Sequence, residues 1–166
     1  MTQSQRTAKP VQDPGMTPEE VFRRYRDTVY RLAVARTGST HNADDILQEV
    51  FLRYIRSAPL FLDEEHRKAW LLRVTVNCCN SFMGSAWRRH TVPLEENLGA
   101  RPKEQSDLWD TLRSLSPTHR TVIHLFYYED RSVREIAEIL EISESAVKVR
   151  LHRARNKLRD LLEEGE

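Results

Sequence analysis

Residues 132–159 have the sequence SVREIAEILEISESAVKVRLHRARNKLR, and this segment indicates the fold most clearly. Ser132 followed three residues later by Glu135 is the pattern of a capping box, which predicts that a helix begins here. Ser143 can cap a second helix after a break at Glu141. The apolar residues of the second helix recur at helical spacing and form one stripe, composed of Val147, Leu151, Ala154 and Leu158. The segment therefore predicts a helix-turn-helix unit.

The face of the second helix opposite this stripe is suited to nucleic acid. Residues 147–159 carry six basic side chains and no acid. In a recognition helix the N-terminal half reaches base edges in the major groove, and basic side chains contact phosphates. Val149 could contact a thymine methyl group, and His152 a base or a phosphate. The candidate DNA-binding residues are Ser145, Lys148, Val149, Arg150, His152, Arg153 and Arg155.

Two features of this segment leave alternatives open. Helix pairs are common, and a helical hairpin whose basic face is merely solvated has the same periodicity. In addition, Glu141 stands where helix-turn-helix units often place glycine. A residue with a side chain can adopt the left-handed conformation at a cost on the order of 1 kcal/mol, so a turn of different construction is also compatible with the sequence.

The remainder of the chain predicts further helices. Thr17 and Glu20 form another capping box, and Gly38 can end the helix that follows. A second helix is expected at about residues 43–56, and a long third helix, capped by Asp63, reaches about residue 88. No segment alternates with period two for long enough to form a sheet, so we expect an all-α protein of two small domains.

The composition between these helices sets the predicted domain boundaries. Helical periodicity fails after residue 92 and resumes at Leu108, and the intervening segment contains Gly99, Pro102 and several acids. The predicted divisions are a disordered tail at 1–15, a helical domain at 16–92, a flexible acidic linker at 93–106 and a helix-turn-helix domain at 107–163.

Composition excludes several classes of protein. The chain has 166 residues, of which 39% are hydrophobic and 31% charged, and this is too polar for a membrane protein. The polar N-terminus lacks the apolar core of a secretory signal. Cys78 and Cys79 are adjacent and no second pair completes a zinc site, so we expect two buried or half-buried thiols in a reducing cytoplasm. No cofactor and no metal are expected.

Residues 43–52, ADDILQEVFL, place polar side chains along one edge of a predicted helix with apolar residues behind them. The polar residues on that edge are Asp45, Gln48 and Glu49, with Asp44 beside them. An acidic first turn favoured by the helix dipole, with a solvated face, would account for this pattern. A surface that contacts another protein is the alternative.

Three segments of the chain resemble bacterial RNA polymerase sigma factors. Residues 43–52 resemble the segment that binds core polymerase, and residues 69–77, AWLLRVTVN, resemble the segment for promoter opening and −10 recognition. Residues 115–155, which end in AVKVRLHRAR, resemble the domain that binds the −35 element. Their order and spacing are similar to the extracytoplasmic-function (ECF) group, the smallest sigma factors, which keep two domains. The resemblance covers about residues 17–160.

The resemblance implies a role for each segment. The clamp helices of the polymerase β′ subunit would face Asp44, Asp45, Gln48, Glu49 and Phe51. The −10 DNA would face Arg73, Asn77, Asn80, Trp87, Arg88 and Arg89. The recognition helix would read the −35 element, and the acidic linker would pass near the template strand. The implied partners are core polymerase, through its β′ clamp helices and β flap, promoter DNA, and an anti-sigma protein held between the domains. Membrane insertion is not implied.

The function implied by the resemblance is that of a non-enzymatic promoter-specificity subunit, which binds core polymerase, recognises the −35 and −10 elements and initiates melting. The sequence offers no nucleophile–base pair, paired catalytic carboxylates, phosphate-binding loop or metal cluster. The alternative is a stand-alone helix-turn-helix regulator, which would usually dimerise on two half-sites. A helical adaptor that never touches DNA leaves the basic helix unexplained.

Two departures from the family pattern leave the promoter sequence open. The family often has aspartate a few residues after the position of Asn77, where this chain has Cys79, Asn80 and Ser81. The recognition helix often carries serine or threonine where this chain has Val149. Both departures concern which promoter is read, and neither alters the class of protein.

Overall fold

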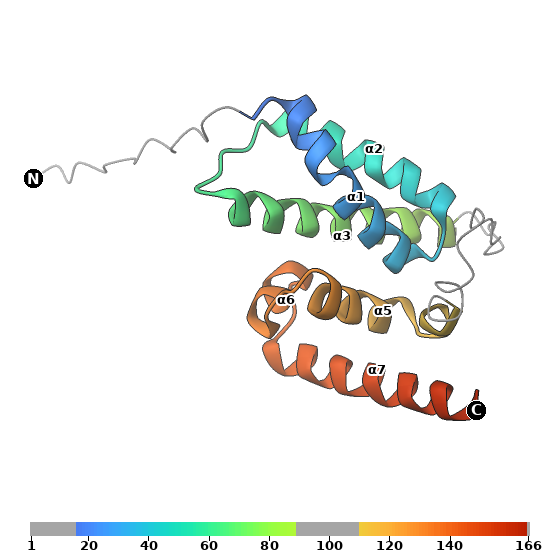
Figure 1. Ribbon diagram of the computed structural model, residues 1–166. Coiled ribbons are helices and arrows are strands. Elements are labelled where there is room, and N and C mark those ends of the chain that lie inside the picture. The colour runs from blue at the N-terminus through green and yellow to red at the C-terminus, as the bar shows by residue number, and fades with distance from the viewer. Residues whose placement is uncertain (1–15, 89–109, 166) are drawn as a thin grey trace, which may run out of the picture.

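The computed structural model describes residues 16–88 and 110–165, and side chains at residues 85–88 are not described. Every regular element in these two ranges is a helix, which confirms the all-α class (Figure 1). The predicted tail at 1–15 and linker at 93–106 lie outside the described residues.

The N-terminal domain consists of α1 (Pro18–Thr37), α2 (Thr40–Ser57) and α3 (Glu64–Arg88). The capping box of α1 is formed, since the Thr17 N–H donates to Glu20 Oε2 at 2.8 Å and the Glu20 N–H donates to Thr17 Oγ1 at 3.2 Å. The helix therefore begins where the sequence predicts.

Local caps also set the other helix ends of this domain. Gly38 ends α1 with a φ of 71°, a conformation that glycine adopts without strain. α2 begins at Thr40 rather than near Ala43, because the hydroxyl of Ser39 accepts a hydrogen bond from the Asn42 N–H at 3.2 Å. Asp63 accepts a hydrogen bond from the His66 N–H at 2.8 Å and so caps α3, as expected.

The N-terminal core lies between the three helices and ends in an aromatic cluster. The ring of Tyr54 stacks on Phe61 with 6.2 Å between centroids, and Trp70 packs edge-on against both rings. Cys78 and Cys79 are free and buried, as the sequence predicts. Burial raises the pKa of Cys79 to about 12, so its thiol stays protonated at neutral pH.

The C-terminal domain follows a helical turn at residues 110–113. Its elements are α5 (Pro117–Ile123), the π-helical turn η1 (His124–Tyr128), α6 (Val133–Leu140) and α7 (Glu144–Glu164).

The predicted helix-turn-helix unit is formed by α6 and α7. Ser132 and Glu135 complete their capping box, and Ser143 caps α7. Glu141 adopts the left-handed conformation with φ 57° and ψ 44°, so the turn has the backbone that glycine usually supplies despite its side chain. The apolar stripe of α7 packs on the core of the domain, as expected, since Val147, Leu151 and Ala154 are buried.

The two domains pack directly against each other and share a core. Leu32 of α1 and Leu72 and Val76 of α3 belong to the same buried cluster as Val122 and Ile136 of the C-terminal domain. Figure 1 shows α2 and α7 on opposite sides of the molecule, with α3 and α5 between them.

Ion pairs surround this shared core. Lys68 of α3 lies 3.0 Å from the buried carboxylate of Glu129, and Arg131 lies 2.8 Å from Glu65. Each pair joins the N-terminal half of α3 to the segment between η1 and α6, so apolar and ionic contacts both hold the domains together.

Candidate functional site

The acidic face of α2 is formed by Asp44, Asp45, Gln48 and Glu49. The first three side chains are exposed, and Glu49 is half-buried and accepts a hydrogen bond at Oε1 from Arg53 Nε at 3.0 Å. A cavity of about 380 Å³ opens beside this face between α2 and α3, and Asp45, Glu49 and Arg53 line it. Four of the five residues predicted to contact polymerase therefore share one accessible surface.

Phe51, the fifth residue of that prediction, does not share the surface. Its side chain is 6% exposed, and its ring packs edge-on against Phe22 with 4.9 Å between centroids. It lies on the core side of α2 and also contacts Tyr54. The structure thus corrects the expectation that Phe51 lies on the surface that faces polymerase. Its side chain packs in the core beneath the acidic face and supports α2 from that side.

The basic face of α7 carries most of the predicted DNA-binding residues. The exposed members are Ser145, Lys148, Val149, His152, Arg153 and Arg155. Val149 is 46% exposed, so its side chain is accessible on this face. Arg155 differs from the other exposed residues because its Nε donates a hydrogen bond to the hydroxyl of Tyr127 at 2.7 Å.

Arg150 differs from the other residues of this set. It is half-buried and lines a cavity together with Arg36 of α1 and Asn80 of α3. The packing of the two domains turns this flank of α7 toward the N-terminal domain. Arg150 therefore does not share the exposed basic face in this arrangement.

The residues predicted to contact −10 DNA lie along α3, beside the C-terminal domain. Arg73 is exposed, and its guanidinium pairs with the carboxylate of Glu141 in the helix-turn-helix turn. Asn80 accepts a hydrogen bond from Arg36 Nη2 at 3.1 Å, and Asn77 is half-buried. The side chains of Trp87 and Arg88, and all of Arg89, lie outside the described residues.

Both domains match parts of one protein family. Residues 21–89 match Sigma-70 region 2, and residues 105–158 match Sigma-70, region 4. The ECF RNA polymerase sigma factor SigL of Mycobacterium tuberculosis is 33% identical over 147 residues, which cover 82% of this chain and 83% of SigL. The chain belongs to the ECF family of RNA polymerase sigma factors.

Other members of the family are similar over most of this sigma factor. SigW of Bacillus subtilis is 30% identical over 83% of the chain and 84% of its own length. SigE of Mycolicibacterium smegmatis is 32% identical over 157 residues, and the match spans 61% of SigE. A match to region 2 as well as region 4 sets aside the alternative of a stand-alone helix-turn-helix regulator.

Solved structures show the same fold. The sigma factor RpoE, in complex with the anti-sigma factor NepR from Bartonella quintana, is similar with a TM-score of 0.73 at 21% identity, over 87% of this chain and 96% of RpoE. CnrH, in complex with the cytosolic domain of CnrY, is similar with a TM-score of 0.64 at 24% identity, over 90% of this chain and 89% of CnrH.

Two apolar side chains extend the acidic face of α2 in this sigma factor, and sequence reasoning did not single them out. Leu52 is 43% exposed and Ile55 is 59% exposed. They follow Asp45 by seven and ten residues, which is close to two and three helical turns, so they continue the same side of the helix. That spacing is the signal in the sequence that could have identified them.

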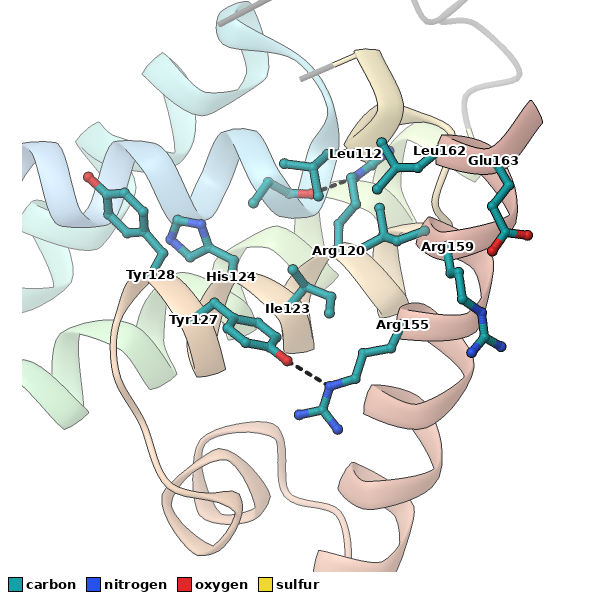
Figure 2. A pocket seen from close by; sticks show the side chains of 12 residues that line it. Leu112, Arg120, Ile123, His124, Tyr127, Tyr128, Arg155, Arg159, Leu162 and Glu163 are labelled. Atoms are coloured by element: carbon teal, nitrogen blue, oxygen red, sulfur yellow. Dashed lines mark hydrogen bonds between the residues drawn. The ribbon is translucent and has the colours of Figure 1, made fainter. Parts of the chain in front are cut away.

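An apolar groove in the C-terminal domain was also not foreseen. It has a volume of about 630 Å³ and lies between η1 and α7, where Ile123, Tyr127, Leu158 and Leu162 line it (Figure 2). Arg155 and Arg159 line its α7 side (Figure 2). Leu162 is 58% exposed, and its place beyond the buried stripe of α7 is the signal that the sequence offers.

Glu129 is a buried acid at the boundary between the domains. Its Oε2 lies 3.0 Å from Lys68 Nζ, and its Oε1 lies 3.7 Å from Nε2 of His124. Burial acts to raise the pKa of Glu129, but His124 and Lys68 outweigh it and bring the pKa below its ordinary value. The carboxylate is therefore ionised at neutral pH, and its ion pair with Lys68 joins the two domains.

The described residues contain no group of three or more His, Cys, Asp and Glu side chains placed to hold a metal ion. Among the same residues, no helix combines the length and the apolar character needed to span a membrane.

Proposed function

We propose that this sigma factor brings core RNA polymerase to promoters through surfaces on opposite sides of one chain. The observation that supports this most is the separation of α2, with its acidic face, from α7, with its basic face (Figure 1). Such a molecule can bind polymerase with one surface while the other reads DNA. The chain carries out no chemistry in this proposal, and it acts in the cytoplasm.

The acidic face of α2 binds the clamp helices of the β′ subunit. Complementary charge on a basic coiled coil accelerates and orients docking. Leu52 and Ile55 add apolar contact area next to the charged residues, as interfaces commonly combine an apolar centre with a polar rim. Phe51 contributes by supporting α2 from the core side.

The basic face of α7 recognises the −35 element. Lys148 and Arg153 contact phosphates, which positions the helix, while Val149 and His152 reach base edges in the major groove. Because a single small module neutralises few phosphates, the DNA affinity of the chain alone is weak and falls steeply with salt.

The α3 face that carries Arg73, Asn77 and Asn80 engages the −10 element. It acts together with Trp87, Arg88 and Arg89, whose aromatic and cationic groups suit the capture of an opened strand. Glu141 pairs with Arg73 in the packed arrangement, and both side chains are more than half exposed, so the pair opens by side-chain rotation when Arg73 reaches DNA. The linker at 93–106 then passes near the template strand.

The apolar groove between η1 and α7 accepts an apolar helix of the β flap of polymerase. An anti-sigma protein is the second partner proposed for this chain, because the similar sigma factor RpoE was solved in complex with the anti-sigma factor NepR, and the similar protein CnrH was also solved with a partner. A groove of about 630 Å³ with an apolar lining suits a helix with apolar anchors at i, i+3 and i+7.

Association with core polymerase tests this proposal directly. The full chain is labelled at its N-terminus and titrated with purified core polymerase while fluorescence anisotropy is recorded. A saturable rise, reversed by an unlabelled competing sigma factor, is expected. A flat titration with active core polymerase would contradict the proposal, and a flat result with the isolated clamp helices alone would move the contact to another surface.

A further inference from the structure

A small polar cavity lies at the seam between the two domains. Its volume is about 160 Å³, well above the roughly 15 Å³ that one water molecule requires. Helices of both domains supply its polar lining, with Arg36 from α1, Asn80 from α3, Thr118 and Thr121 from α5 and Arg150 from α7. We call this set the seam cavity. Two of its residues also belong to proposed DNA contacts, Asn80 on the −10 face and Arg150 in the predicted −35 set, whereas Arg36 and Thr118 belong to none.

The seam cavity brings two guanidinium groups together without an acid between them. Among the described residues, neither Arg36 nor Arg150 has a carboxylate within ion-pair distance, whereas Arg53, Arg73 and Arg131 each have at least one. Burial, together with the charge of Arg150, lowers the pKa of Arg36. Packing of the two domains therefore concentrates positive charge at the seam cavity. Repulsion between the two guanidinium groups opposes this packing.

The hydrogen-bonding state of Arg36 also indicates a missing acceptor. One donor, at Nη2, is used by Asn80 at 3.1 Å. Its Nε is buried and has no hydrogen-bond partner among the described residues. Since an unsatisfied donor in a partly dry site is costly, a group with several acceptor oxygens would relieve both the charge and the unmet donors.

We propose that the seam cavity binds a phosphate group. The planar fork of a guanidinium matches the oxygens of a phosphate, and the hydroxyl of Thr118 and the amide of Asn80 supply further polar contacts. The volume is below the range of about 300–1,000 Å³ that whole ligands occupy, so the site takes one phosphoryl group. That group belongs to a small phosphorylated molecule or to a DNA backbone.

Binding at the seam cavity is linked to the arrangement of the domains. The site is complete only when the two domains pack, because each domain contributes one of its two arginines. A ligand that binds only the packed arrangement shifts the population toward it. In that arrangement Glu141 engages Arg73, so phosphate would hold the sigma factor in a form whose −10 face is partly occupied.

Thermal unfolding of the full chain tests the proposal, with pyrophosphate and inorganic phosphate as probes and sodium chloride at equal ionic strength as the reference. Pyrophosphate at tens of times its Kd is expected to raise Tm by about 3 °C or more. Arg36→Gln and Arg150→Gln are expected to weaken the binding of pyrophosphate, measured by ³¹P NMR titration, by about tenfold or more. No rise in Tm for the wild type, or an equal rise in both variants, would overturn the proposal.

The matched control is Arg134→Gln, which removes the same charge from an exposed position on α6. It is expected to keep the full response to pyrophosphate. If Arg36→Gln does not fold, Arg150→Gln and Asn80→Ala carry the test. No polymerase is present in these measurements, so their outcome is separate from that of the proposed function.

A parallel titration with a 20-base-pair duplex distinguishes the two sources of phosphate. Arg36 belongs to no predicted DNA surface, so its substitution is informative here. If Arg36→Gln loses affinity for pyrophosphate but not for the duplex, the ligand is a small phosphorylated molecule. If the variant loses affinity for the duplex equally, the ligand is a phosphate of the DNA backbone. Both results support a phosphate site in the seam cavity.

Discussion

Arg120 of α5 donates a hydrogen bond from Nε to the carbonyl oxygen of Ala35 at 2.7 Å, and it thereby joins the C-terminal domain to the last turn of α1 (Figure 2). Its Nη1 donates to the carbonyl oxygens of Arg113 and Leu115, each at 3.1 Å. A carbonyl near a helix C-terminus has no partner within the helix. A buried arginine from the other domain supplies the missing donor here.

Arg120→Leu is expected to lower the free energy of unfolding by about 2–4 kcal/mol, because it leaves three carbonyl groups without their donor, two of them in buried hydrogen bonds. Urea unfolding of the full chain measures this. Arg134→Leu, at an exposed position, should stay within about 0.5 kcal/mol of the wild type. A loss of similar size in both variants would mean that the contact of Arg120 with Ala35 has no special part in domain packing.

Alanine is usually more stabilising than glycine within a helix, and the left-handed backbone at Glu141 predicts the reverse order of stability at this position. Glu141→Gly and Glu141→Ala both remove the exposed pair with Arg73, but only glycine adopts φ 57° without strain. Glu141→Gly should therefore be more stable than Glu141→Ala by about 1 kcal/mol.

Glu138, within α6, is the control for this comparison. There glycine should be less stable than alanine by about 1 kcal/mol, since the backbone is right-handed helix. Urea midpoints of the four variants measure both differences. The same order at both positions would contradict the turn geometry.

The Glu129 carboxylate predicts a loss of stability in acid. Because its pKa is lower in the folded chain than the ordinary value of 4.5, its contribution is present above that value and is lost as the pH falls toward the folded pKa. Glu129→Gln should be less stable than the wild type at pH 7, and the difference should shrink below about pH 4.5. Glu138→Gln, at an exposed site, should follow the wild-type profile in urea unfolding from pH 7 to pH 3. A constant difference between Glu129→Gln and the wild type would refute the role of the ionised pair.

Charge reversal on α2 tests the surface proposed for polymerase. Asp45→Lys combined with Glu49→Lys should weaken association with core polymerase by about tenfold or more, because a basic partner would then meet like charge. Circular dichroism should show an intact fold. Asp27→Lys, on the exposed side of α1, reverses one charge elsewhere and should bind normally. Unchanged affinity in the α2 variant would move the interface to another surface.

Helix ends could be predicted from the sequence because the interactions that set them are local. The capping boxes at Thr17 and Ser132 involve residues only three positions apart, and both are formed. Glu141 shows the limit of such reasoning, since propensity left its turn open and packing of α6 on α7 determined it.

Whether a side chain faces the core, the other domain or solvent could not be predicted in the same way. Phe51 and Glu49 are two residues apart, yet one is buried and the other belongs to the acidic face, because the direction in which α2 packs decides between them. Arg150 lies on the same helix as Lys148, but its side chain faces α1 and α3 only because the two domains share a core. Long-range packing of this kind leaves no periodic signal in one sequence.

Transcription in vitro with core polymerase tests the central claim most directly. The purified chain is mixed with core polymerase and a library of genomic fragments, and the 5′ ends of the transcripts are mapped. We predict discrete start sites that share a pair of upstream elements, and lower transcript yield for Lys148→Ala and Arg153→Ala with unchanged polymerase binding. An absence of starts from a stable complex with polymerase, or loss of polymerase binding in those two variants, would contradict the account.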